Sequence, residues 1–481
     1  MTTLLNKGHA PTGNPWHVLA IVITGVFMLL VDVSIVNVAI PSIRHSLNAS
    51  SGQIQLISAG YQLAFACVLI TAGRLGDIYG RRYLFLIGML GFTLASIAAG
   101  AAPSAPVLIL ARVVQGFFGG LLFPQVLSSI RVAFSPQQQG QAFSVFGAAI
   151  GVATAAGPLL GGVLIFVDVL GLDWRAVFLV NVPIGALALA AAWRWLPASR
   201  NQQRPRLDMP GTALITLGLF MLIYPITEGR AQGWPVYMLA LLVAAVVVLA
   251  GFTVLQRHKT RHDQSPLVPM SLFNDRAFCV GLALIFVFVL GLPAFFFTLS
   301  IFLQVGFGYS ALTAGSVQFA FAIGSGTASW YSDWVARRLD VTVLNLGAGV
   351  VALAMTGLLL SVHAMGADLD PWLLTPLLVL AGAGLGLFIA PVTNIVLQRV
   401  RGSAAGAASG VFTTAQRLGG SVGVAAVGMV FFGKLSAVAD GKSVRLAYSS
   451  AFQHALLYEI GVFLAAFLLV FLLPGKRNEG G

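Results

Sequence analysis

The chain has 481 residues, of which 58% are hydrophobic and only 9% are charged, against roughly 25% charged in a soluble globular protein. This balance excludes a soluble fold, because a soluble core could not hide that much apolar surface, and it predicts a polytopic membrane protein. The formal net charge is +12, and the basic residues are scattered singly between apolar segments. Membrane topology therefore explains the charge better than nucleic-acid binding does.

Apolar stretches of about 20 residues, the length that crosses a bilayer, follow one another along the whole chain. An even number of them places both termini on one side of the membrane. With both termini inside, about 19 of the Lys and Arg residues fall in internal loops and about 6 in external loops, so we expect cytoplasmic termini. We expect roughly fourteen spans, namely 16–40, 54–73, 83–101, 106–130, 140–166, 176–196, 209–228, 235–255, 279–303, 311–331, 342–362, 371–397, 405–432 and 452–473.

Two polar linkers divide these spans. Residues 197–210 follow the sixth span and residues 256–278 precede the ninth, with two spans between them. Parallel halves of six helices are a known transporter architecture, in which the substrate site lies at the midplane between the halves. We therefore expect an N-terminal six-helix bundle, an inserted helix pair with its linkers, and a C-terminal six-helix bundle, with boundaries at 1–200, 201–260 and 261–481.

A short polar connection, Gly73–Leu84, joins the second and third spans. Asp77 and Arg81 are four residues apart, the spacing at which opposite charges meet on a helix. Gly73 and Gly80 would let another backbone approach closely. The connection is either a solvated turn that fixes orientation or part of a cytoplasmic gate.

A partial repeat favours the gate. The pattern Asp-x-x-x-Arg-Arg, which runs from Asp77 to Arg82, recurs from Asp333 through Arg337 to Arg338, again just after a long apolar segment. Each copy follows the second span of its six, so the expected gate has two parts.

Asp32 lies deep in the first span, about 16 residues or roughly 24 Å from Trp16. A charge at the bilayer centre costs several kcal/mol and calls for a reason. We interpret Asp32 as a proton- or cation-handling carboxylate facing a polar cavity; the alternative is a structural carboxylate paired permanently with an arginine. Arg112 in the fourth span is the expected partner, and Gln115 shares its face. Asn37 follows Asp32 on the same segment.

The fifth span carries Gly157-Pro158-Leu-Leu-Gly161-Gly162. Proline within a span removes a backbone hydrogen bond, and the glycines allow tight packing and bending. A hinge or seal between helices and a plain helix-packing site both remain open.

The last span contains Glu459, a second candidate for proton coupling, which Lys434 or Arg445 could instead neutralise. Aromatic and polar side chains could line a cavity for flat lipophilic molecules. The candidates for this substrate cavity are Asn37, Tyr61, Phe65, Gln115, Phe296, Gln304 and Arg417.

Taken together, these motifs resemble those of the drug:proton antiporters of the major facilitator superfamily, specifically the fourteen-helix branch, over essentially the whole chain. The similar segments are Asp32–Pro41, Gly73–Leu84, Arg112–Gly120, Gly157–Gly162, Trp174–Gly185 and Gln416–Ser421.

The resemblance implies alternating access between two six-helix bundles of an all-helical fold, driven by a proton gradient and with no cofactor or metal. Asp77 and Arg81 would hold the cytoplasmic side shut, and Arg112 would influence proton release. The fifth-helix motif would seal against leak. The expected partners are protons, membrane lipid and drug-like compounds, lipophilic and often cationic, with no nucleic acid. We expect a monomer in a bacterial cytoplasmic membrane.

Two alternatives are retained. One is a major facilitator transporter specific for a single metabolite, antibiotic or lipid-like compound. The other, a membrane enzyme, is supported only by Gly419-Gly-Ser-Val-Gly423, which matches a nucleophile pattern that needs a strand-turn-helix setting. Here the pattern lies inside an apolar span, so no catalytic residue is expected.

Overall fold

A computed structural model describes residues 14–168, 171–197, 207–229, 232–262, 266–398, 400, 404–438 and 443–474. Helices are the only regular secondary structure in these ranges, which confirms the all-helical class. The helices are α1 (Pro15–Ser46), α2 (Ser51–Tyr79), α3 (Arg81–Gly100), α4 (Ala105–Ala133), α5 (Pro136–Val167), α6 (Ala176–Leu179), α7 (Asn181–Trp195), α8 (Met209–Glu228), α9 (Val236–Arg261), α10 (Arg276–Ile301), α11 (Ala311–Leu339), α12 (Thr342–Met365), α13 (Thr375–Gln398), α14 (Ala405–Val438) and α15 (Val444–Leu469).

Polar residues ahead of the apolar stretches begin several of these helices. The side chain of Asn14 accepts a hydrogen bond from the Trp16 N–H at the start of α1. Ser50 and Gln53 form a capping box at the start of α2, and Asp275 accepts from the first N–H groups of α10. Each cap satisfies amides that the helix itself leaves without an acceptor.

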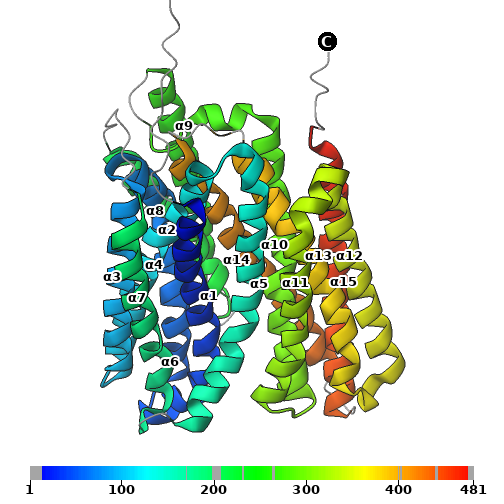
Figure 1. Cartoon of the computed structure of the whole chain (residues 1–481). Helices are drawn as coiled ribbons and strands as arrows, with labels where there is room; N and C mark the ends of the chain where they lie inside the picture. Colours follow the sequence, from blue (N-terminus) through cyan, green and yellow to red (C-terminus); the bar gives the residue numbers. More distant parts are fainter. Residues whose placement is uncertain are drawn as a thin grey trace, which may run out of the picture.

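Twelve helical segments of the described chain are long and apolar enough to cross a membrane, which confirms a multi-pass membrane protein. Two further long helices, α5 with 32 residues and α11 with 29, lie where two more spans are expected. They pack against each other in the middle of the molecule (Figure 1). The total of fourteen spans stays a prediction.

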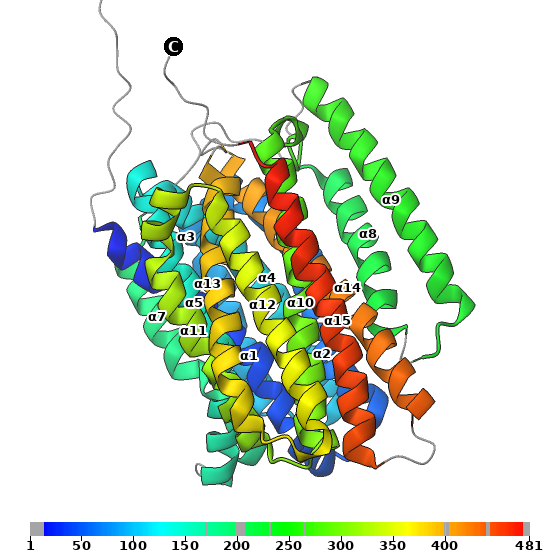
Figure 2. The same cartoon turned by 90° about the vertical axis from the view of Figure 1, so that its right-hand side faces the viewer.

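The early helices α1–α7, here called the N-terminal bundle, lie beside the late helices α10–α15, the C-terminal bundle (Figure 1). Two seams join the bundles, one between α5 and α11 and one between α2 and α14. The helices α8 and α9 stand outside both bundles (Figure 2). Of these two, α8 packs against α2 and α14, while α9 packs mainly on α8.

The stretch Gly73–Leu84 differs from its expected form as a polar connection. Helix α2 continues through Asp77 to Tyr79, and α3 begins at Arg81. Gly80 alone separates them, with a φ of 102° that side-chain-bearing residues rarely adopt. The charges did not require a loop, because they are satisfied between packed helices, as described below.

The inserted helices are fastened together by Asp208, which is buried just before α8. Its carboxylate accepts hydrogen bonds from Lys259 Nζ at 2.6 Å, Gln256 Nε2 at 2.7 Å and the Gly211 N–H at 2.8 Å. Burial alone would raise the pKa of Asp208, but these donors outweigh it and hold the pKa below its ordinary value. Gln256 also accepts from the Val268 N–H, so the following linker is tied to α9.

Candidate functional site

A buried charge network surrounds Asp32 in the N-terminal bundle. Its carboxylate accepts hydrogen bonds from Arg112 Nη1 at 2.5 Å, Gln115 Nε2 at 2.9 Å and Asn181 Nδ2 at 2.9 Å. The Gln115 and Asn181 amides also donate to Ser96 Oγ. All five side chains are buried. The expected pairing of Asp32 with Arg112 is therefore present, and it is reinforced by three uncharged groups.

Aromatic rings enclose the guanidinium of Arg112. Its Cζ lies 4.2 Å from the centre of the Tyr61 ring and 5.6 Å from that of Phe178. Its Nε donates to the Ile57 carbonyl at 3.3 Å. Such contacts favour a cation over the ring face and keep the ion pair away from water.

Sequence reasoning missed two members of the network. Ser96 is a single small polar residue in an apolar helix, which gives no usable signal. Asn181 is the first residue of α7, two residues after α6 ends, and it lies within the segment Trp174–Gly185 that carries part of the family resemblance. A polar amide at a helix interruption within a span is the signal that could have identified it.

The first expected gate lies on the seam between α2 and α14. Asp77 is buried and pairs with Arg81 at 3.1 Å. Its two oxygens also accept the backbone N–H groups of Gly406 and Ala407, both at 3.2 Å, from the first turn of α14 in the opposite bundle. A helix N-terminus presents free amides and a positive dipole end, so a carboxylate fits there well.

Close backbone contact makes this seam depend on glycine. A Cβ added to Gly73 would lie 2.1 Å from the Gly406 carbonyl oxygen, and one added to Gly406 would lie 2.1 Å from the Gly73 carbonyl oxygen. No side chain can be inserted at such a distance without separating α2 from α14. The role expected for Gly73 thus has a direct structural reason.

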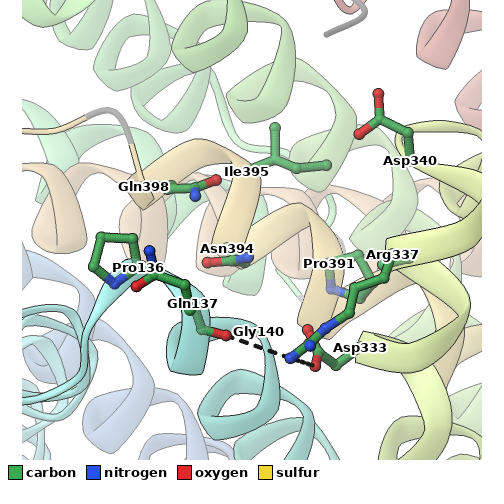
Figure 3. Close-up of a pocket in the computed structure, with 11 residues that line it drawn as sticks. Pro136, Gln137, Gly140, Asp333, Arg337, Asp340, Pro391, Asn394, Ile395 and Gln398 are labelled. Atoms are coloured by element: carbon green, nitrogen blue, oxygen red, sulfur yellow. Dashed lines mark hydrogen bonds and ion pairs between the residues drawn. The ribbon is translucent and has the colours of Figure 1, made fainter.

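The second copy of the pattern lies on the seam between α11 and α5. Asp333 pairs with Arg337 at 2.7 Å, and Arg337 donates weakly to the Gln137 carbonyl at 3.4 Å. A Cβ on Gly140 would lie 1.8 Å from Asp333 Oδ1. Figure 3 shows Asp333 and Arg337 lining a pocket of about 410 Å³ that Asn394 on α13 also borders.

Further contacts close the same end of the molecule. Arg131, at the end of α4, donates to the carbonyls of Leu397 and Gln398 in the last turn of α13 and of Val400 just beyond it. Ser144 and Ser332 share a buried hydrogen bond of 2.8 Å. Within the described residues, the hydrogen bonds between the two bundles all lie at this end. Arg131 was not predicted, because a lone arginine at a span end is ordinary topology.

Arg82, expected in the gate, instead binds within its own bundle. It donates to the Trp193 carbonyl on α7, and its Cζ lies 5.6 Å from the Trp193 ring.

The glycines of the fifth-helix motif pack α5 onto α1 beside Asp32. A Cβ on Gly157 would lie 1.8 Å from Ser34 Oγ, and one on Gly161 would lie 2.9 Å from the side chain of Ile35. Gly162 faces open space, with only Leu312 as near as 4.0 Å. The Pro158 side chain lies outside the described residues.

Glu459 on α15 is fully buried in the C-terminal bundle. Neither carboxylate oxygen has a hydrogen-bond partner among the described residues, and Oε2 would lie 2.6 Å from a Cβ on Gly291 of α10. The pairing with Lys434 or Arg445 that sequence left open is absent from the described ion pairs.

The residues expected in a substrate cavity lie in more than one part of the described structure. Gln115 belongs to the Asp32 network. The Tyr61 ring lies against Arg112 of that network and also stacks with Phe65, which lies under the guanidinium of Arg417. Two others lie elsewhere: Phe296 packs edge-on against Phe321 at 4.9 Å, and Gln304 donates to Ser300 Oγ. The Asn37 side chain is outside the described residues.

The enzyme-like pattern has a packing role. Gly419 and Gly423 lie inside α14, where an added Cβ would meet the carbonyls of Phe286 and Leu290 on α10. Ser421 is on a continuous helix rather than on a strand-to-helix turn. Across the described chain, no three His, Cys, Asp or Glu side chains are grouped to hold a metal ion.

Comparison with known proteins agrees with this architecture. The profile of the Major Facilitator Superfamily matches residues 22–424. The chain belongs to this superfamily. As a member of the Major Facilitator Superfamily it is a membrane transporter and not an enzyme. The structure of the human organic anion transporter MFSD10 has a similar fold, with a TM-score of 0.66 at 16% identity, over 95% of this chain and all of that one.

Several curated relatives are named as antibiotic export or resistance proteins. The "Probable actinorhodin transporter" of Streptomyces coelicolor is 37% identical over 442 residues, 91% of this chain and 76% of that protein. The puromycin resistance protein pur8 of Streptomyces alboniger is 34% identical over 479 residues, 98% of this chain and 93% of that protein.

Proposed function

We propose that the protein is a proton-coupled exporter of drug-like organic compounds, in the fourteen-helix branch of the superfamily. It would lie in a bacterial cytoplasmic membrane with both termini inside. The proton gradient would drive export by antiport, with no other cofactor. Export or resistance proteins among the relatives support the direction of transport.

The observation that carries the proposal is the buried Asp32 network. A carboxylate in the middle of a span, held by one guanidinium and two amides, is expensive to retain and marks an ion or proton path. Protonation of Asp32 would remove the counter-charge of Arg112 and leave a buried cation unpaired, at a cost of several kcal/mol. Proton binding would therefore favour a different arrangement of the surrounding helices.

The closed end of the molecule gives the cycle its second part. Because the bundles are joined at the end that carries Asp77 and Asp333, this form would be closed toward the cytoplasm and competent to face outside. Opening inward would break the bonds from Gly406 and Ala407 to Asp77. Glu459, buried without a partner, would be a second proton carrier in the opposite bundle.

A specific exporter is the second candidate. Relatives named for single antibiotics, such as tetracenomycin C and puromycin, favour it. The same network would then serve one substrate, so a panel of compounds distinguishes the two.

The experiment uses purified protein in liposomes that enclose a pH-sensitive dye. A proton gradient is imposed, and lipophilic cations, anions and neutral compounds are added in turn. We expect compound-dependent proton movement in the native protein and none with Asp32→Asn. The matched control is Asp208→Asn, because Asp208 is another buried carboxylate bonded to a cation and an amide. This variant should retain compound-dependent proton movement.

Coupled movement that survives in Asp32→Asn would remove Asp32 as the coupling site. A response to several unrelated compounds would establish a polyspecific exporter, and a response to one compound would establish the specific one. Absence of any response in the native protein would contradict proton coupling.

A further inference from the structure

The guanidinium of the half-buried Arg417 has surroundings unlike those of the buried Arg112. Arg417 lies on α14 about 12 residues from Ala405, or roughly 18 Å into the helix. Its Cζ lies 4.4 Å from the centre of the Phe65 ring on α2 and 5.8 Å from that of Phe123 on α4. One cation of the C-terminal bundle is thus held over an aromatic surface of the N-terminal bundle, midway along the seam.

No anion of the protein compensates this cation in the described part of the chain. The four ion pairs found there involve other residues, and no hydrogen bond involves the Arg417 guanidinium. Arg112, by contrast, is neutralised by Asp32. A cation inside a membrane protein ordinarily has a counter-charge or a polar cavity to face, and stacking on rings replaces only part of that stabilisation.

None of the buried carboxylates of the two bundles forms an ion pair with Arg417 in the described part of the chain. Asp32 accepts three hydrogen bonds within its own network. Glu459 lies against Gly291 on α10 and makes no ion pair with Arg417. Asp77 is held at the gate by Arg81 and α14. The protein therefore leaves one positive charge available at the seam.

A second unsatisfied group lies beside Arg417. The hydroxyl of Tyr61 is buried and has no hydrogen-bond partner among the described residues. The Tyr61 ring stacks with Phe65, with centroids 6.0 Å apart, and Tyr61 interacts electrostatically with Arg417. A cation and a free O–H donor bordered by phenyl rings are what an organic anion requires of a binding site.

We infer that Arg417, Tyr61 and the rings of Phe65 and Phe123 form the binding site for a planar aromatic anion, a carboxylate or phenolate, which is the charge class that the exporter carries. This inference rests on the proposed export function and adds the sign of the substrate charge. Cationic compounds, expected from the family resemblance, fit poorly because an unpaired guanidinium repels them in a low-dielectric setting. The rings provide an apolar surface for the flat part of the ligand.

The test is equilibrium binding to purified protein in detergent, without a proton gradient, of three probes with the same ring system. These are 1-naphthoate, 1-naphthamide and 1-naphthylmethylammonium, measured by calorimetry. We expect the native protein to bind naphthoate about tenfold more tightly than either of the others, the factor that one charge-assisted hydrogen bond provides.

Variants separate charge from packing. Arg417→Gln should lower the affinity for naphthoate about tenfold and change the affinity for naphthamide less than twofold, because only the charged contact is lost. Arg417→Lys should keep part of the preference. Phe65→Leu, which leaves Arg417 in place, should lower the affinities for all three probes by similar factors. The control is Arg445→Gln: Arg445 also lies over a ring, 5.4 Å from that of Phe307, and its loss should leave all three affinities unchanged.

Three results would overturn the inference: tightest binding of the ammonium probe, a naphthoate preference that survives in Arg417→Gln of unchanged melting temperature, or no binding of any probe. None depends on proton coupling. Loss of coupled proton movement in the liposome assay with intact naphthoate preference would instead contradict the export cycle alone. Intact proton coupling without a preference for the anionic probe would support the export cycle and contradict the assignment of an anionic substrate.

Discussion

The two copies of the Asp-x-x-x-Arg pattern occupy matching places in the two bundles but differ in burial. The Asp77 side chain is 1% exposed, and its Arg81 partner is 11% exposed. The Asp333 side chain is 18% exposed, and Arg337 is 63% exposed beside an open pocket. The same spacing of charges thus produces a buried ion pair on one seam and a solvent-exposed ion pair on the other.

The contribution of each copy to holding the bundles together therefore depends on the groups that it contacts across the seam. Asp77 receives two backbone amides from the opposite bundle, and bonds to a charged group contribute about 1.5–3 kcal/mol each. Asp333 has an ion pair within its own helix, and exposed pairs contribute roughly 0–1 kcal/mol. We expect the first gate to dominate closure.

The largest expected effect comes from a matched pair of glycine substitutions. Gly406→Val would place a Cβ against the Gly73 carbonyl oxygen, a backbone atom that cannot move aside. Gly140→Val would meet only the end of the Asp333 side chain, which can rotate. We expect transport in proteoliposomes to fall by about a hundredfold with Gly406→Val, an amount corresponding to roughly 3 kcal/mol, and only a few-fold with Gly140→Val. Equal losses would contradict the comparison.

Neutralising the two aspartates should give the next largest difference. Asp77→Asn removes the charge that binds the first turn of α14, so we expect a transport rate about tenfold lower, as for the loss of roughly 1.4 kcal/mol. Asp333→Asn should change the rate less than threefold. Probe binding should be unchanged in both, because neither residue touches the Arg417 site. A greater loss with Asp333→Asn would reverse the order of the two gates.

A third aspartate tests whether burial alone explains Asp77. Asp208 is equally buried and bonded, but it joins α8 to α9 and crosses neither seam. We expect Asp208→Asn to keep the native transport rate per folded molecule and to lower the melting temperature by roughly 1–3 °C. A transport loss equal to that of Asp77→Asn would show that burial, rather than the seam, is decisive.

The effect of Asp208→Asn on the melting temperature should depend on pH. Because the folded pKa of Asp208 is lowered, its stabilising contribution is present above the unfolded pKa of about 3.9 and is lost as pH falls through the folded value. The difference in melting temperature between native protein and Asp208→Asn should therefore be constant from about pH 8 to 5 and should shrink below about pH 4. A difference that grows on acidification would contradict this sign.

The smallest effect is expected at Arg337. Its guanidinium is mostly in water, so Arg337→Gln should alter transport less than twofold, and 0.5 M salt should have little further effect on the variant. Arg81→Gln is the matched comparison and should cost more, because Arg81 balances a buried carboxylate.

The charged members of the Asp32 network could be recognised in the sequence. Asp32 and Arg112 stand out because charges in apolar spans are expensive, and Gln115 follows from helical spacing. Ser96 and Asn181 were missed because uncharged polar residues are common in helices and their grouping depends on packing. The stretch Gly73–Leu84 was interpreted as a connection because its polarity is typical of loops. Its charges are satisfied by α14, more than 300 residues away in sequence, which no local pattern reveals.

The single-residue joint at Gly80 has a mechanical consequence. Only Gly80 separates α2 from α3, so we expect a displacement of one helix to displace the other. Helix α2 carries Asp77 at the proposed gate, and α3 carries Ser96 among the hydrogen bonds around Asp32. In the proposed export cycle, movement of α2 would therefore reach the Asp32 network directly through α3. The orientation of this one helical hairpin would then link opening of the gate to the protonation of Asp32.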